Sequence, residues 1–154
     1  MIPLPALRLI SAHARASWPA ECCGLILEDA KGARTFRPIA NVAGTAAGQG
    51  NSKRSQRDGY VMDPQALLGA LQETEDSGGR LWAIVHSHPD VGAYFSKEDR
   101  EMALGGGDEP LWPGVQYLVV SVRSTGVDGA RLYTWDAEKR DFREEEVPEI
   151  TNVS

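Results

Sequence analysis

The stretch at residues 82–100, WAIVHSHPDVGAYFSKEDR, is the part of this chain from which its fold is best predicted. It begins with an apolar run of strand length, and His86 and His88 close that run before Pro89. Side chains alternate along an extended strand, so the two histidines project from the same face, close enough to bind one ion. Ser96 and Asp99 follow at the spacing of a helix N-terminus. The stretch therefore predicts a buried strand that ends in a candidate metal site and leads into a helix.

Helices and strands interleave along the rest of the chain. The expected elements are a helix at 3–17, strands at 22–27 and 34–40, a helix at 63–77, a strand at 81–85, a helix at 96–105, and strands at 115–122, 130–135 and 141–147. Some strands follow one another directly as hairpins, and others are separated by helices. We therefore expect an α/β (α+β) fold with a mixed, largely antiparallel β-sheet flanked by helices.

Length and composition predict one globular domain. The 154 residues, 42% of them hydrophobic, suit a single core over residues 1–147, followed by a frayed tail at 148–154. Residues 41–56 are rich in Gly, Ala, Ser and Asn without a hydrophobic period, so they predict a long loop that is either a groove wall or a mobile lid.

Charge and cysteine content exclude several classes of partner. A net charge of −6 argues against binding to nucleic acid or to an anionic membrane surface. No apolar run approaches the roughly 18 residues of a membrane helix. The only cysteines, Cys22 and Cys23, are adjacent and offer no disulfide framework. Such cysteines are typical of a reducing interior, so we expect a cytoplasmic protein.

The residues around the histidine pair supply what a hydrolytic zinc site needs. Such a site has three protein ligands, and His86, His88 and Asp99 offer two nitrogens and one oxygen. It also needs a carboxylate that is not a ligand, as general base. Glu21 is the candidate, because pairing of strand 22–27 with strand 81–85 would bring it beside the histidines. The hydroxyl of Ser96 is a candidate oxyanion donor.

Each candidate also has a structural explanation. A histidine pair at a strand end is often simply hydrogen-bonded structure. The spacing of Ser96 and Asp99 is a capping box in its own right, and Glu21 alone is typical of a solvated surface acid. The two cysteines are expected to be small core residues. Only the joint pattern favours a metal site.

That joint pattern resembles the JAMM (JAB/MPN) metallopeptidase family. The signature of the family is an upstream glutamate, then His-x-His, seven residues, Ser, two residues and Asp, and the segment from His86 to Asp99 matches this spacing without a gap. The resemblance implies a JAB/MPN-like (cytidine-deaminase-like) fold. It further implies that His86, His88 and Asp99 bind Zn2+, that Glu21 is the general acid/base, and that Ser96 supports the tetrahedral intermediate.

Within the family, the chain looks most like small bacterial members that process ubiquitin-like sulfur-carrier proteins. This resemblance implies hydrolysis of a peptide or isopeptide bond after the C-terminal Gly-Gly of such a carrier. Lys53, Arg54 and Arg57 form a basic cluster that would meet an acidic carrier or a terminal carboxylate, or would simply be solvated. One departure from the family pattern is Phe95, where many bacterial relatives carry proline.

Other functions stay open on sequence alone. They are a deubiquitinase-like peptidase, a cell-wall peptidase of the phage-tail type, and a noncatalytic MPN-type scaffold. Nucleobase deamination is excluded, because the chain has no Pro-Cys-x-x-Cys ligand pair. The sequence determines neither the carrier, nor the length of tail removed, nor the oligomeric state, for which a homodimer is one alternative.

Overall fold

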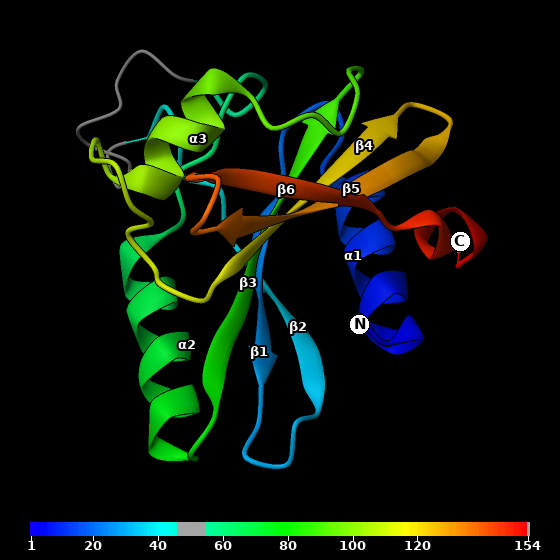
Figure 1. Cartoon of the computed structure of the whole chain (residues 1–154). Helices are drawn as coiled ribbons and strands as arrows, with labels where there is room; N and C mark the ends of the chain where they lie inside the picture. The colour runs from blue at the N-terminus through cyan, green and yellow to red at the C-terminus, as the bar shows by residue number, and fades with distance from the viewer. Residues whose placement is uncertain (46–54, 154) are drawn as a thin grey trace.

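A single six-stranded sheet organises the computed structural model, which describes residues 1–45 and 55–153 (Figure 1). The strand order is β2-β1-β3-β4-β5-β6, and only the β3–β4 pair is parallel. The expectation of a mixed, largely antiparallel sheet is therefore confirmed. The strands are β1 (Cys23–Glu28), β2 (Arg34–Ile39), β3 (Arg80–Pro89), β4 (Gln116–Arg123), β5 (Gly126–Asp136) and β6 (Asp141–Glu146).

Helices cover both faces of the sheet (Figure 1). They are α1 (Leu4–Ser17), α2 (Pro64–Asp76), α3 (Lys97–Leu104) and the 3-10 helix η2 (Pro148–Asn152). Strand β1 shows how two faces arise from one sequence, because successive side chains point to opposite sides. Ile26 packs in the core beneath α1, whereas Leu25 and Leu27 pack with Ala70 of α2. Helices α1 and α2 thus pack against opposite faces of the sheet.

The pairing of β1 with β3 sets the position of the candidate site. The two strands are antiparallel, with Cys23 opposite His86, so the predicted pairing of segments 22–27 and 81–85 is confirmed. Glu21 lies just before β1 and therefore arrives beside the C-terminal end of β3. Helix α3 lies at this same end of the sheet (Figure 1). It begins at a capping box and ends at Gly105, whose φ of 57° is the left-handed conformation that favours glycine.

Three features differ from the sequence-based expectation. Strand β3 runs from Arg80 to Pro89 and so extends beyond the expected 81–85 at both ends, with both histidines in its C-terminal part as the alternation of side chains requires. Strand β5 begins at Gly126 rather than at 130, because its first residues still pair with the end of β4. The predicted frayed tail is ordered as far as it is described: η2 buries Ile150 completely in the core beneath α1. Val147 and Val153, on either side of η2, pack against the same core, so three apolar side chains hold this short segment.

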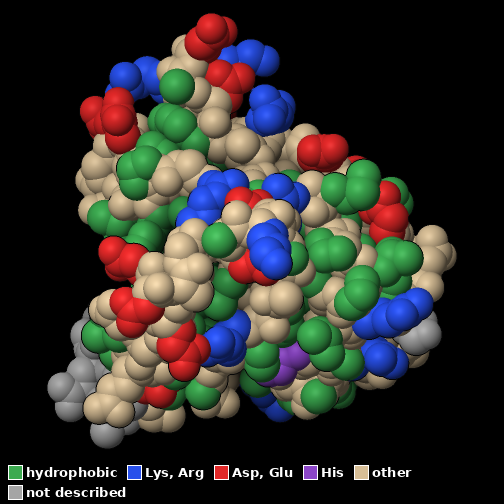
Figure 2. Space-filling view, turned by 90° about the horizontal axis from the view of Figure 1, so that it is seen from below, with side chains coloured by type: hydrophobic (Ala, Val, Ile, Leu, Met, Phe, Trp, Pro, Cys, Tyr) green, Lys and Arg blue, Asp and Glu red, His purple; other side chains and the backbone are tan. Residues whose placement is uncertain are grey.

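Most of the predicted long loop cannot be compared with the structure, whereas the surface can. Residues 46–54 lie outside the described residues, and with them most of the predicted loop, including Lys53 and Arg54. No helix in the described ranges is long and apolar enough to cross a membrane. Figure 2 shows acidic and basic side chains interspersed over the face that is seen from below.

Candidate metal centre

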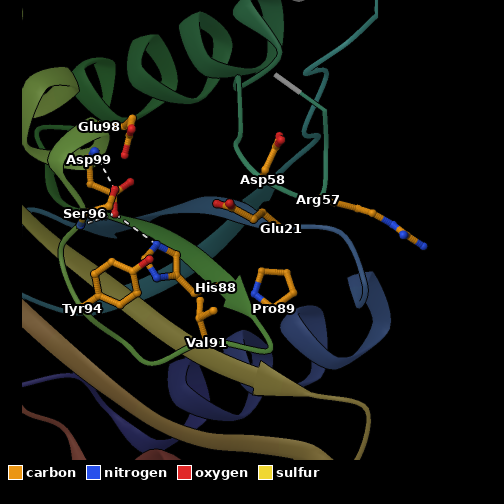
Figure 3. A pocket seen from close by; sticks show the side chains of 10 residues that line it. All are labelled: Glu21, Arg57, Asp58, His88, Pro89, Val91, Tyr94, Ser96, Glu98 and Asp99. Atoms are coloured by element: carbon orange, nitrogen blue, oxygen red, sulfur yellow. Dashed lines mark hydrogen bonds and ion pairs between the residues drawn. The ribbon is translucent and has the colours of Figure 1, made fainter. Parts of the chain in front are cut away.

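A pocket of about 240 Å³ lies at the C-terminal end of β3 (Figure 3). Its walls come from four parts of the chain: Glu21, which lies two residues before β1, the segment before α2, the end of β3 with its following loop, and the start of α3. The lining residues are Glu21, Arg57, Asp58, His88, Pro89, Val91, Tyr94, Ser96, Glu98 and Asp99. The fold therefore brings most of the sequence-predicted site residues to one cavity, and His86 lies buried behind it.

Three donor atoms converge within this site. His86 Nε2 and His88 Nε2 are 3.2 Å apart, and each lies 3.1 Å from Asp99 Oδ2. Zinc bonds of about 2.0–2.1 Å at tetrahedral angles place ligand atoms about 3.4 Å apart. The observed triangle is close to that spacing, and two imidazoles with one carboxylate form a common zinc donor set. The residues present therefore fit a zinc ion with one coordination position open.

The orientation of His88 also suits metal binding. Its Nδ1 lies 3.1 Å from the carbonyl oxygen of Gly92, and because a carbonyl only accepts, Nδ1 carries the proton. This contact turns Nε2 toward Asp99, as expected for a histidine whose other nitrogen binds a metal. Burial lowers the pKa of His88, but the hydrogen bond and charge of Asp99 outweigh it and raise the pKa overall.

Asp99 is held in place by the start of α3. The Ser96 N–H donates to Asp99 Oδ2, and the Asp99 N–H donates to Ser96 Oγ, each at 3.0 Å. The predicted capping box is therefore present. Burial disfavours the Asp99 carboxylate, yet its hydrogen bonds with the two histidines hold its pKa well below the usual range. Asp99 is thus an anion that faces both imidazoles, and Ser96 is a cap whose hydroxyl also lines the pocket.

Glu21 is not a solvated surface acid, because only 7% of it is exposed. Donor atoms of Glu21, His86 and His88 all lie within 4.8 Å of one another. The backbone of Glu21 is hydrogen-bonded on both sides: its N–H donates to the Gln56 carbonyl at 2.6 Å, and its carbonyl accepts from Asn41 Nδ2 at 2.9 Å. In Figure 3 its side chain comes from the side opposite Tyr94 and Val91.

Aromatic side chains that the sequence analysis did not identify contact both histidines. The buried ring of Tyr60 stacks on His86, with ring centroids 4.7 Å apart. The ring of Tyr94 meets His88 edge-on at 5.0 Å and is 49% exposed at the pocket. Neither tyrosine belongs to a periodic pattern or to the histidine motif, so a single sequence contains no signal for these contacts.

Phe95 anchors the segment between His88 and α3. Its ring stacks on Tyr133 at 4.8 Å and meets Phe142 edge-on at 4.9 Å. Phe95 is not among the residues that line the metal pocket, and its ring packs in this aromatic cluster instead. It restrains this segment through aromatic packing, where proline would restrain it through its ring.

The two cysteines are core residues, as predicted. Both are free and buried. Burial raises the pKa of the Cys22 thiol to about 11, and it raises the pKa of Cys23 further. Neither thiol has the lowered pKa of a nucleophile. Of the predicted basic cluster, Arg57 lies at the pocket wall, and the other two residues lie outside the described part of the chain.

Comparison with known proteins agrees with this geometry. A family described as prokaryotic homologs of the JAB domain matches residues 3–136. A desampylase from Haloferax volcanii is 31% identical over 118 residues, which cover 73% of each chain. The tail tip assembly protein K of Escherichia phage N15 is 30% identical over 91 residues, which cover 59% of this chain and 31% of that protein.

Solved structures show the same fold. A protein from Desulfitobacterium hafniense matches with a TM-score of 0.65 and 23% identity, over 92% of this chain and 86% of that chain. A protein from Salinibacter ruber matches with a TM-score of 0.60 and 23% identity, over 96% and 90% of the two chains. The architecture is therefore shared across nearly the whole length of this chain.

Proposed function

Because this chain belongs to the family of prokaryotic JAB-domain homologs, we propose that it is a zinc-dependent isopeptidase that acts on a ubiquitin-like protein. The bond cleaved is the one that follows a C-terminal Gly-Gly. The observation that carries the proposal is the convergence of His86, His88 and Asp99 at 3.1–3.2 Å, with the buried Glu21 beside them.

Each residue of the site has a separate role in the proposed hydrolysis. Zinc held by His86, His88 and Asp99 would supply Lewis acidity and lower the pKa of a bound water to about 7. Glu21 accepts the proton of the attacking water and delivers it to the departing amine. Its burial keeps that proton away from bulk solvent. The Ser96 hydroxyl oxygen accepts from the Asp99 N–H, which leaves its own O–H to donate to the oxyanion that develops on the scissile carbonyl.

The shape of the pocket supports a glycine-rich substrate tail. It holds about 240 Å³, and Tyr94 and Val91 stand across from Glu21 and Asp58 (Figure 3). An extended segment without side chains fits between such walls more easily than a bulky one. The similarity to a desampylase supports a ubiquitin-like substrate. We propose a sulfur-carrier protein as that substrate and the cytoplasm, where free cysteines persist, as its location.

A second candidate is a peptidase function in phage-tail assembly, favoured by the similarity to protein K. That similarity covers only 31% of protein K, so it supports a shared domain more strongly than a shared role. A noncatalytic scaffold is less well supported, because such a protein has no need for three converging donor atoms and a buried carboxylate.

The test combines metal analysis with a substrate assay. Protein purified without chelators is expected to hold about one zinc per chain. It is then incubated with sulfur-carrier proteins that bear extensions after Gly-Gly, and the mass lost is measured. Cleavage after Gly-Gly that disappears in Glu21→Gln supports the proposal. Absence of zinc, or cleavage of cell-wall peptides alone, would overturn it.

A further inference from the structure

The side chain of Asn41 uses its complete hydrogen-bonding capacity next to the candidate site. Its Nδ2 donates to the carbonyls of Glu21 at 2.9 Å and of Gly59 at 3.1 Å. Its Oδ1 accepts from the N–H groups of Ala43 and Val61, each at 3.1 Å. A carboxamide has two N–H donors and two acceptor lone pairs, so all four are occupied. Only one orientation of the amide satisfies two carbonyls and two N–H groups at once.

The backbone of Asn41 closes the neck of the long loop. Asn41 forms an isolated antiparallel bridge with Met62, and the Val42 N–H donates to the Val61 carbonyl at 2.8 Å. The side chain of Gln56 donates to the Asn41 carbonyl at 2.9 Å. Bonds at Asn41 and at its neighbour Val42 therefore tie the two ends of the loop together.

Through these bonds Asn41 connects three parts of the site. The first is Glu21, whose carbonyl it holds directly. The second is the wall formed by Arg57 and Asp58, which lies between Gln56 and Gly59. The third is Tyr60, the neighbour of Gly59, whose ring stacks on His86.

Glu21 needs such support because it lies outside the sheet. The ladder between β1 and β3 begins at Cys23, two residues after Glu21. The main chain of Glu21 is held by Asn41 on its carbonyl and by Gln56 on its N–H. A general base acts only within hydrogen-bond reach of the proton that it takes, and a displacement of about 1 Å costs roughly 100-fold in rate.

We propose that Asn41 is a positioning residue for Glu21, which clamps the base to the loop that forms the pocket wall. The proposal rests on the hydrolytic function proposed above. The bonds that Asn41 donates hold Glu21 and Gly59, and the bonds that it accepts shape the loop neck. Substitutions at Asn41 can remove the donated bonds without removing the accepted ones.

Two substitutions, Asn41→Asp and Asn41→Ala, distinguish the donated bonds from the accepted bonds. Asn41→Asp is almost isosteric and retains the two accepted bonds but loses both donated ones, whereas Asn41→Ala loses all four. The matched control is Asp29→Ala, in the β1–β2 turn at the other end of β1. This control removes two bonds that a side-chain oxygen accepts from the Lys31 and Ala33 N–H groups at 2.8 and 2.9 Å.

Three quantities are measured in each variant: kcat and KM on the carrier substrate, zinc content, and residue-level amide hydrogen exchange in the metal-free protein. Both Asn41 variants are expected to lower kcat by about 10–100-fold, with KM and zinc content nearly unchanged. The Glu21 amide should exchange faster in both, and the Val61 amide only in Asn41→Ala. Asp29→Ala should retain the wild-type kcat and the wild-type exchange at Glu21.

The outcomes distinguish this inference from the proposed function. Wild-type kcat in either Asn41 variant, or a loss of kcat that only follows a loss of zinc, overturns the positioning role. If kcat falls in Asn41→Ala as well as in Asn41→Asp, the negative charge that aspartate introduces is not the cause of the loss. If the wild-type protein hydrolyses none of the carriers, the proposed function fails. The positioning role of Asn41 is then tested by hydrogen exchange alone, and an unchanged exchange rate of the Glu21 amide in metal-free Asn41→Asp would overturn it. Where Asn41→Ala does not fold, Asn41→Asp decides alone.

Discussion

Cys22 and Ser87 are joined by two reciprocal hydrogen bonds between the start of β1 and the end of β3. The Cys22 N–H donates to Ser87 Oγ at 2.8 Å, and the Ser87 N–H donates to the Cys22 carbonyl at 3.0 Å. Ser87 separates His86 from His88, and Cys22 follows Glu21. This pair of bonds therefore fixes the backbone next to Glu21, the proposed base, against the candidate metal ligands.

Ser87→Ala is expected to lower the free energy of unfolding by about 1–3 kcal/mol, because the buried Cys22 N–H loses its partner. Urea denaturation of the metal-free protein measures this change. The control is Ser77→Ala at the exposed end of α2, where the hydroxyl donates to the Thr74 carbonyl, and a change within about 0.5 kcal/mol is expected. Equal stability of the two variants would show that the Cys22 amide finds another partner.

Substitutions at Glu21 and Asp99 are expected to separate catalysis from metal binding. Glu21→Gln should retain zinc while kcat falls by about 10²–10⁴-fold, because a proton carrier is lost and a ligand is not. Asp99→Asn should lose zinc on dialysis, because one of three protein ligands is weakened. Metal analysis and turnover of the same samples provide the check. Zinc loss in Glu21→Gln would instead identify Glu21 as a ligand.

The local part of the site was predictable because its information is local. His86, His88, Ser96 and Asp99 lie within one strand-to-helix segment, where spacing alone determines which side chains share a face. Glu21 required one further step, the pairing of β1 with β3, and apolar runs of strand length indicated it.

The rest of the site depends on long-range contacts that the hydrophobic periodicity of the sequence does not indicate. Asn41 and Tyr60 reach the site from a loop, through hydrogen bonds and ring stacking that depend on the folded sheet. The C-terminal segment was misjudged for a similar reason, because Ile150, Val147 and Val153 pack against a core that exists only in the folded protein. The composition of a short window does not indicate such contacts, because they join residues that are far apart in the sequence.

Tyr94 is expected to determine selectivity for glycine next to the cleaved bond. Its half-exposed ring forms a pocket wall beside His88. Tyr94→Ala should widen that space, so that a carrier ending in Gly-Ala is accepted better. The ratio of kcat/KM for Gly-Gly over Gly-Ala should fall by about tenfold. Tyr94→Phe keeps the ring and should keep the ratio. An unchanged ratio in Tyr94→Ala would place the selectivity elsewhere in the pocket.

The thiol of Cys22 is expected to resist alkylation in the folded protein. Burial raises its pKa to about 11, so at pH 8 about one thiol in a thousand is ionised, and its sulfur is enclosed. Labelling with iodoacetamide, followed by mass spectrometry, should modify neither cysteine until denaturant is added. The variant Ser55→Cys, which places a thiol at an exposed position, should react rapidly under the same conditions. Rapid native labelling of Cys22 would contradict this expectation.

Gly24 is required for the close approach of β1 and β2. A Cβ atom at this position would lie 2.5 Å from Phe36 Cε1 and 2.7 Å from the Arg37 carbonyl oxygen, which is part of the backbone and has little freedom to move. Gly24→Ala is therefore expected to destabilise the protein by about 1–3 kcal/mol through overpacking. Gly69 is the matched control, because it lies within α2 and a Cβ there meets nothing within 4 Å. Gly69→Ala should instead stabilise by about 0.5–1 kcal/mol, since alanine favours the helix. Urea denaturation of both variants measures the opposite signs, and a neutral Gly24→Ala would mean that β2 separates from β1 at little cost.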